Sequence, residues 1–131
     1  MINRSLADRW LLRARSNLIR ARQGKTAPGI MYEDLCFDCE QAAEKALKGL
    51  LVLKGIVPPQ THSLSLLIET LEKHEIPVPD YVKAEVSLTY YAVATRYPGL
   101  YEEISRAEYL KALKGAENML GWIEEQYKIA D

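Results

Sequence analysis

The residues with the clearest chemical potential are cationic. Lys45 and Lys48 share one row with Gln41 at steps of three and four residues, so a helix places their side chains on one face. Far downstream, Arg96 lies in the segment Thr95-Arg96-Tyr97-Pro98. The guanidinium fork of an arginine can hold two phosphate oxygens at once. We therefore hypothesise an anion-binding groove that joins Lys45, Lys48 and Arg96, with an ordinary solvated helix face as the alternative for the lysine row.

A histidine and two tyrosines are further candidates for that groove. Phenol rings stack on bases and donate to phosphate, although they also fill cores and interfaces. His62 precedes an expected helix, where it caps the helix, packs against a tyrosine or tryptophan, or faces the groove. Arg96 has a second interpretation as well, as a helix-terminal arginine that satisfies carbonyl groups. The candidate nucleotide- or phosphate-binding residues are Lys45, Lys48, His62, Arg96, Tyr97 and Tyr101.

The pair Cys36 and Cys39 does not indicate a metal or redox site. Its C-x-x-C spacing lies inside a helical pattern, and neither His62 nor His74 is at a ligating spacing from it. A redox pair would follow a strand, and no strand pattern precedes Cys36. We expect reduced, structural cysteines in the core, with no bound metal and no cofactor.

Charge is distributed unevenly along this chain of 131 residues, whose net charge is −1. Residues 1–25 contain seven basic residues and one acidic residue, which gives a net charge of +6, whereas the rest of the chain carries −7. Such asymmetry indicates a surface for RNA, nucleotide or an acidic partner. Alternatively, the basic first helix lies against acidic helices of the same bundle, such as the last one.

Length and composition indicate one domain over residues 1–131. With 48% hydrophobic and 27% charged residues, the chain has the composition of an ordinary globular protein. No apolar run approaches the roughly 20 residues that span a bilayer. The N-terminus leads straight into a charged amphipathic pattern, without the apolar core of a signal peptide. We expect a cytoplasmic protein without membrane contact.

Hydrophobic periodicity predicts only helices, over residues 3–24, 31–54, 63–74, 81–95 and 105–127. Gly24 and Pro58-Pro59 interrupt the pattern, Asp80 is expected to cap the fourth helix, and Ser105 with Glu108 forms a capping box for the last one. Small residues on the stripe of the second helix favour it as the central helix, because they let another helix approach closely. The expected fold class is all-α, an antiparallel bundle of four to five helices.

The same periodicity predicts which residues are buried. On the first helix these are Leu6, Trp10, Ala14, Leu18 and Ala21. On the second they are Leu35, Cys39, Ala43, Ala46, Leu50 and Leu53. On the last they are Leu110, Leu113, Ala116, Leu120, Ile123 and Tyr127.

Four groups of residues resemble those of a known family. They are Trp10 with Ala14, the run from Gln41 to Lys48, His62-Ser63-Leu64 and Thr95-Arg96-Tyr97-Pro98. In order and spacing they resemble the prokaryotic HEPN domain, over almost the whole chain. The resemblance implies an antiparallel helical bundle that usually dimerises and has a small basic cleft. Many members are RNA-cutting toxins encoded beside a minimal nucleotidyltransferase that acts as antitoxin, and others are thought to bind nucleotides.

The ribonuclease motif that the resemblance implies is incomplete here. In that metal-independent site an arginine holds the phosphate, and a histidine that follows after four to six intervening residues transfers the proton when the 2′-OH attacks. Arg96 falls in the matching region, but His62 and His74 both precede it and no histidine follows. Related nucleotidyltransferases modify a tyrosine just after this motif, and Tyr101 is the nearest analogue.

Three functional hypotheses follow. In the first, a homodimeric HEPN protein is the partner of a minimal nucleotidyltransferase and binds nucleotide or RNA phosphate in a basic cleft. In the second, the protein is a metal-independent RNase toxin with a non-standard proton carrier, such as His62. In the third, it is a purely structural dimerisation module. The missing histidine favours binding over cleavage and leaves open whether the protein is an enzyme.

Overall fold

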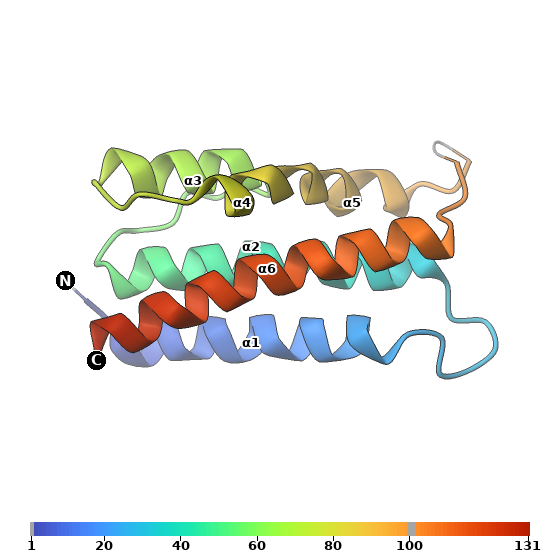
Figure 1. Ribbon diagram of the computed structural model, residues 1–131, viewed down its shortest axis with the longest axis horizontal. Coiled ribbons are helices and arrows are strands. Elements are labelled where there is room, and N and C mark those ends of the chain that lie inside the picture. The colour runs from blue at the N-terminus through green and yellow to red at the C-terminus, as the bar shows by residue number, and fades with distance from the viewer. Residues whose placement is uncertain (1, 100–101) are drawn as a thin grey trace.

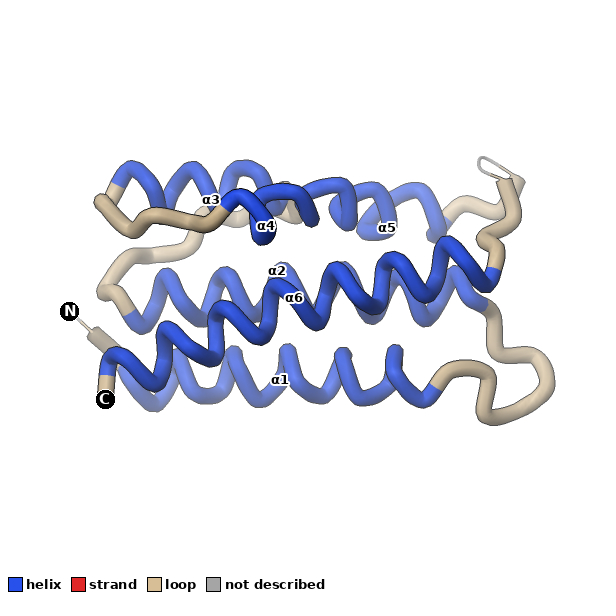
Figure 2. Tube along the Cα trace, in the orientation of Figure 1, coloured by secondary structure: helices blue, strands red, loops and turns tan. Residues whose placement is uncertain are grey.

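The protein is built from helices that lie along one axis (Figures 1 and 2). The computed structural model describes residues 2–99 and 102–131, apart from the side chain of Arg96, so the candidate residue Tyr101 lies outside the described part. The regular helices are α1 (Arg4–Gln23), α2 (Tyr32–Leu53), α3 (Leu64–Lys73) and α6 (Arg106–Ala130). A further arm combines α4 (Asp80–Lys83), η1 (Ala84–Thr89), α5 (Tyr90–Val93) and η2 (Ala94–Arg96). No strand occurs among the described residues, and the predicted all-α bundle is confirmed.

The other helices pack around α2. Figure 1 shows α1 on one side of α2 and α3 with the arm from α4 to η2 on the other, while α6 crosses over α2 and contacts both α1 and the arm. The helices α2, α3 and α6 point in one direction, whereas α1 and the arm point in the opposite one, so α1 is antiparallel to both of its neighbours. The two chain ends therefore lie at the same end of the bundle.

The predicted central position of α2 is confirmed. This helix contacts α1, α3, α5, α6 and both 3-10 segments. Its predicted apolar stripe from Leu35 to Leu53 is buried throughout, and the small residues Ala42, Ala43 and Ala46 are fully enclosed. Because these side chains are short, α1 and α6 can pack close to the α2 backbone.

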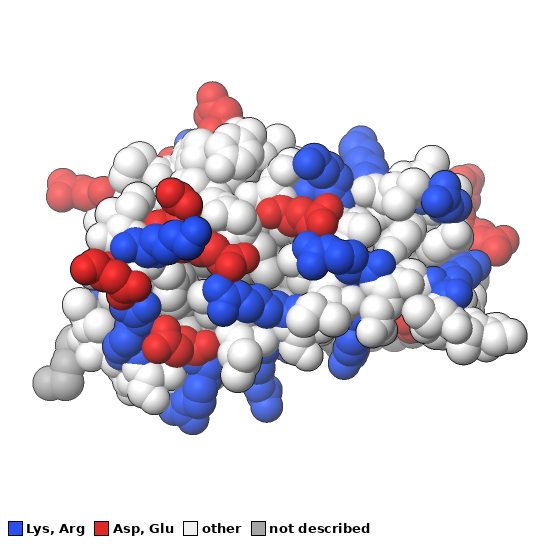
Figure 3. All heavy atoms as spheres, turned by 60° about the horizontal axis from the view of Figure 1, so that its bottom comes forward, with Lys and Arg blue, Asp and Glu red and all other residues white. Residues whose placement is uncertain are grey.

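Ion pairs line the contact between α1 and α6. They join Arg4 to Asp131 at 2.6 Å, Arg15 to Glu124 at 2.7 Å and Arg22 to Glu117 at 3.0 Å. Figure 3 shows the face that carries both helices, where basic and acidic side chains alternate. The structure thus confirms that part of the basic first helix lies against the last helix, through the acidic residues Glu117, Glu124 and Asp131. Exposed pairs of this kind each contribute about 0–1 kcal/mol, but together they select which face of α1 turns toward α6.

The fourth predicted helix is wrong in detail. Instead of a regular α-helix over residues 81–95, the arm alternates between α and 3-10 geometry. Val86, Thr89, Val93 and Thr95 are β-branched, and such residues lower helix propensity. The Thr89 hydroxyl also accepts from the backbone N–H of Leu64 at 3.1 Å, so this segment is fixed by tertiary contacts. Asp80 is the first helical residue rather than the cap, which is Pro79.

Two predicted stripes need correction as well. On α1 the buried residues include Ala7 and Leu11, whereas Leu6 and Trp10 are only partly buried. The reason is a close contact, because the Tyr127 hydroxyl donates to the Ala7 carbonyl at 2.7 Å and turns that side of α1 inward. On α6, Leu110 is 41% exposed and Tyr109 is buried in its place.

One of the two hydrogen bonds of the predicted capping box at the start of α6 is confirmed, since the Ser105 hydroxyl accepts from the Glu108 N–H at 3.1 Å.

The cysteines have the predicted structural role. Cys36 and Cys39 are both free thiols and both fully buried. Burial raises the pKa of each thiol, so neither forms a reactive thiolate near neutral pH. None of the helices in the described residues is both long enough and apolar enough to cross a membrane.

Two helical glycines give a matched test of the packing of α2. A Cβ added at Gly49 would lie 2.7 Å from the Tyr127 hydroxyl and 2.9 Å from the Trp10 Cβ, whereas one added at the exposed Gly121 of α6 would meet nothing within 4 Å. We expect Gly49→Ala to lower the free energy of unfolding by about 1–3 kcal/mol through overpacking. Gly121→Ala should raise it by up to about 1 kcal/mol through helix propensity alone.

Chemical denaturation of both variants checks this prediction. If Gly49→Ala is as stabilising as Gly121→Ala, α1 and α2 are not in the close contact described.

Candidate anion-binding face

Arg9 and Arg13 differ from the other arginines of α1. Arg4, Arg15 and Arg22 pair with α6 or the residue that follows it, and Arg20 pairs with Asp38 of α2 at 2.7 Å. Arg9 and Arg13 are exposed, lie one helical turn apart and form no hydrogen bond or ion pair with any described residue. Like charges at this spacing repel each other. A bound anion would relieve that repulsion.

Lys45 adds a third cation beside these two arginines. Its Nζ donates to the Asn17 side-chain oxygen at 2.8 Å, and Asn17 in turn donates to the buried Asp38 at 2.9 Å. Burial lowers the pKa of Lys45, and the nearby charges of Arg13 and Arg20 lower it further. The carboxylates of Glu44 and Asp38 act in the opposite direction and partly offset these two charges.

Glu44 connects two further candidates, Lys48 and His62. Lys48 Nζ lies 2.9 Å from Glu44 Oε2, and His62 Nδ1 lies 2.9 Å from Glu44 Oε1. The Lys48 ammonium is also 5.9 Å from the centre of the Trp10 ring. Sequence analysis missed Glu44 as a partner, although its spacing of four residues from Lys48 is a signal for a helical ion pair.

The structure thus places several cationic candidates together on one surface. We call it the α1–α2 face and define it by Arg9, Arg13, Lys45, Lys48 and His62. Among the predicted residues, Lys45, Lys48 and His62 belong to it. Arg9 and Arg13 were missed, because sequence alone does not show which basic residues of α1 face α6.

The other predicted residues lie elsewhere along the bundle. Arg96 ends η2, at the end of the bundle where α2 begins, whereas Lys45 and Lys48 lie in the second half of α2 (Figure 1). Tyr97 is 54% exposed. The Arg96 side chain and Tyr101 are outside the described part, so their place in a groove with the lysines stays a prediction.

A buried carboxyl group lies next to this network. Glu40 is fully buried, with Oε1 accepting from the Gln41 amide at 2.7 Å and Oε2 without a hydrogen-bond partner in the described structure. Burial and the neighbouring Glu44 raise the pKa of Glu40 to about 8. Burial alone would raise the pKa of Glu44 too, but hydrogen bonds from Lys48 and His62 outweigh burial and lower it. Glu40 is therefore the protonated partner and Glu44 the charged one at neutral pH.

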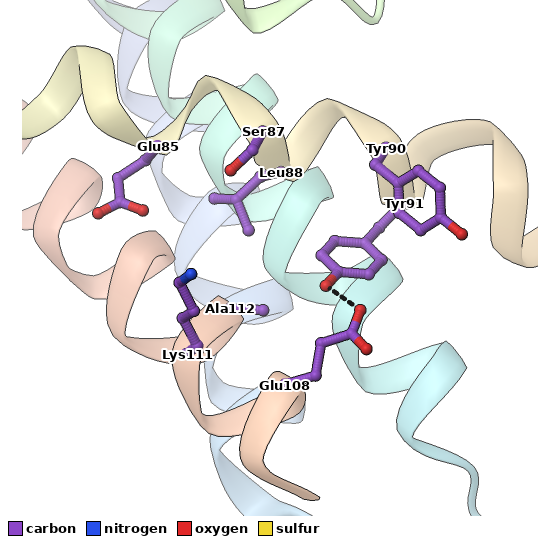
Figure 4. A pocket seen from close by; sticks show the side chains of 8 residues that line it. All are labelled: Glu85, Ser87, Leu88, Tyr90, Tyr91, Glu108, Lys111 and Ala112. Carbon is purple, nitrogen blue, oxygen red and sulfur yellow. Dashed lines mark hydrogen bonds between the residues drawn. The ribbon is translucent and has the colours of Figure 1, made fainter. Parts of the chain in front are cut away.

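A pocket of about 310 Å³ lies between the arm and α6 (Figure 4). Glu85 and Lys111 point into it from opposite sides, and the Tyr91 hydroxyl donates to Glu108 Oε2 at 2.6 Å. Burial and this hydrogen bond raise the pKa of Tyr91, so it cannot act as a base near neutral pH. With two carboxyl groups and one ammonium group, the pocket does not favour phosphate. No three His, Cys, Asp or Glu side chains in the described part of the chain are grouped so that they could hold a metal ion.

The protonated state of Glu40 can be tested through the pH dependence of stability. Between its ordinary pKa of 4.5 and about 8, folded Glu40 keeps a proton that the unfolded chain releases. Its contribution to stability is therefore complete below about pH 4.5, decreases as the pH rises and is lost above about pH 8. We expect Glu40→Gln, which mimics the protonated form, to be more stable than the natural protein at pH 8 by a few kcal/mol.

This difference should shrink toward pH 5, as measured by urea denaturation across that range. Glu125→Gln, at an exposed position of α6, is the control and should show no such trend. A Glu40→Gln difference that stays constant with pH would contradict a proton on Glu40.

Comparisons with known proteins agree with this architecture. A model of the HEPN domain family matches residues 7–126. The crystal structure of TT1696 from Thermus thermophilus is similar with a TM-score of 0.79 and 36% sequence identity, over 91% of this chain and 96% of that one. The archaeal HEPN homologue ST0689 is similar with a TM-score of 0.71 and 29% identity, over 92% of this chain and 96% of that one. A comparison with curated proteins gives no match. Since the family model spans nearly the whole helical core and both structures share the fold, this chain belongs to the HEPN domain family.

Proposed function

We propose that this HEPN protein binds the phosphates of RNA or of a nucleotide on its α1–α2 face. The observation that carries the proposal is the pair Arg9 and Arg13, which are exposed, adjacent and without a partner among the described residues. Lys45 lies near Arg13, and burial together with the charge of Arg13 lowers the pKa of Lys45. Arginine forks and ammonium groups are the groups that proteins use to hold phosphate oxygens.

Negative charge on this face is limited. Within the network around Lys48, Glu44 supplies one carboxylate to two basic partners, Lys48 and His62. Glu40 carries a proton at neutral pH, because its pKa is about 8. The face therefore keeps a net positive charge that can attract a polyanion over several ångströms.

We further propose that the protein is a homodimer and the partner of a minimal nucleotidyltransferase in a toxin–antitoxin-type pair. Large exposed side chains support an interface on the arm, where Tyr90 and Val93 are each at least half exposed. Light scattering would contradict the dimer if it gave a mass near the 14.9 kDa of one chain. Co-purification from the natural host tests the enzyme partner, and its repeated absence would count against the pair.

Arg96, Tyr97 and Tyr101 keep a place in this proposal as a separate contact region. Of these residues, Tyr97 is described; it directly follows η2 and would contact phosphate or bases apart from the α1–α2 face. The exposed ring of Tyr97 supports this, because it is available for stacking. An unchanged RNA affinity in the Arg96→Gln variant would remove this region from the site.

A metal-independent RNase is the second candidate function. The observation in its favour is the pair Glu44–His62, because a carboxylate on one ring nitrogen orients a histidine for proton transfer by the other. The His62 side chain is 54% exposed and can reach a ligand on the α1–α2 face. RNA cleavage in the presence of EDTA that disappears in the His62→Asn variant would establish this function. RNA that stays intact under these conditions would remove it.

RNA binding can be tested with a charge-matched pair of variants. We expect the double variant Arg9→Gln with Arg13→Gln to bind fluorescently labelled single-stranded RNA at least ten-fold more weakly than the natural protein. The slope of log affinity against log salt should fall by about 0.7 for each phosphate that the variant no longer neutralises. Fluorescence anisotropy at several salt concentrations measures both quantities.

The control removes the same charge from the same helix. Arg15→Gln with Arg22→Gln breaks two exposed pairs with α6 but leaves the α1–α2 face intact. If both double variants lose affinity equally, binding depends only on the overall charge of α1. If neither loses affinity, the α1–α2 face does not bind RNA.

A further inference from the structure

Two hollows open on either side of Trp10. One, of about 280 Å³, is lined by Leu6, Arg9, Trp10 and Arg13. The other, of about 380 Å³, continues from Leu6 and Trp10 to Lys48 and to the loop residues Pro58, Pro59 and Gln60. Trp10 therefore belongs to the wall of both hollows, and each hollow has at least one basic residue in its lining.

The position of Trp10 is fixed before any ligand arrives. A Cβ added at Gly49 would lie 2.9 Å from the Trp10 Cβ, which shows how tightly the base of this side chain packs against α2. The ring itself remains only partly buried, although the sequence pattern predicts a core residue. A partly exposed indole is suited to stacking, because a tryptophan side chain has few rotatable bonds and loses little entropy when a flat ring covers it.

The charges around Trp10 indicate which other chemical group a ligand with a flat ring would have. Arg9 and Arg13 flank Trp10 in sequence, line the same hollow and have no partner among the described residues. On the other side, the Lys48 ammonium lies 5.9 Å from the ring centre but already pairs with Glu44. The free cations are thus concentrated on one side of the indole, which favours a ligand with an aromatic ring at one end and a strong anion at the other.

We propose that Trp10 is the stacking wall for a nucleobase and that Arg9 and Arg13 hold the phosphate of the same nucleotide. The ligand is a nucleotide unit, either free or within a single strand of RNA. This site rests on the proposed binding of RNA or nucleotide phosphate and adds to it the recognition of the base. Stacking on aromatic rings tolerates every base, so the site would select for unpaired nucleotides rather than for one sequence.

Tryptophan fluorescence tests the stacking directly. The chain contains two tryptophans, and Trp122 is only 9% exposed, so quenching by a ligand at this site should come from Trp10. We expect AMP and a short oligoadenylate to quench the natural protein, and adenosine or inorganic phosphate to do so only at concentrations at least ten-fold higher. Quenching should persist in Trp122→Phe and disappear in Trp10→Phe.

Affinities measured with a labelled oligoadenylate separate stacking from charge. We expect Trp10→Leu to bind about ten-fold more weakly and Trp10→Phe, which keeps an aromatic ring, to bind nearly as well as the natural protein. Both variants keep the Cβ that packs against Gly49, so a difference between them reports on the aromatic ring. If the oligoadenylate binds more tightly than AMP, the ligand of this site is a strand of RNA. If both bind with equal affinity, the ligand is a free nucleotide.

The possible failures can be told apart. If RNA binding requires Arg9 and Arg13 but is the same in Trp10→Leu as in the natural protein, the base is not stacked on Trp10, and only the proposed function stands. If inorganic phosphate binds as well as AMP, the site recognises an anion alone and the inference is wrong. If neither AMP nor RNA binds, the inference and the proposed function both fail.

Discussion

The close contact between α1 and α2 determines how the rest of the structure is arranged. Ala7, Ala14 and Ala21 are fully buried on α1, and Gly49 allows the opposing stretch of α2 to approach. The hydrogen bond from Tyr127 to the Ala7 carbonyl then brings α6 against the same region. With one side of α1 fixed in this way, every other side chain on that helix has a defined direction, because residues advance by about 100° each.

That fixed rotation separates the basic residues of α1 into two groups. Arg15 and Arg22, seven residues apart, turn toward α6 and are neutralised there. Arg9 and Arg13 turn away from α6 and keep their charge available. The buried pair of carboxyl groups in α2 supports the same outcome, because Glu40 holds a proton and leaves Glu44 alone to balance Lys48 and His62. Ionisation of Glu40 would reduce the positive potential of the α1–α2 face.

Sequence reasoning predicts what depends on local pattern and misses what depends on rotation between helices. Periodicity and helix-ending residues such as Gly24 are enough to predict α1, α2, α3 and α6, and the small residues identify α2 as the centre. The arm from α4 to η2 departs from the prediction because tertiary contacts such as that of Thr89 override its weak helix propensity. Leu110 and Trp10 are wrongly predicted to be buried, because a rotation of a helix about its axis by less than one turn moves a side chain from the core to its edge.

The residues of the candidate site also divide into those that local spacing predicts and those that depend on how the helices pack. Lys45 and Lys48 are found from their spacing on one helix, and His62 from its position before α3. Arg9 and Arg13 are missed, because their distinction lies in carboxylates that belong to other parts of the chain. Glu40 is missed because its burial depends on the whole bundle. Local spacing thus identifies groups on one element, whereas the charge left uncompensated at a surface emerges only after the helices pack.

The most direct measurement of the central claim is an NMR titration of the isotopically labelled protein with short single-stranded RNA. We expect the Nε signals of Arg9 and Arg13 and the indole N–H of Trp10 to shift together, in a saturable way, while the Nε signals of Arg15 and Arg22 stay in place. Shifts confined to the region of Tyr97, or shared equally by all arginines of α1, would contradict this claim.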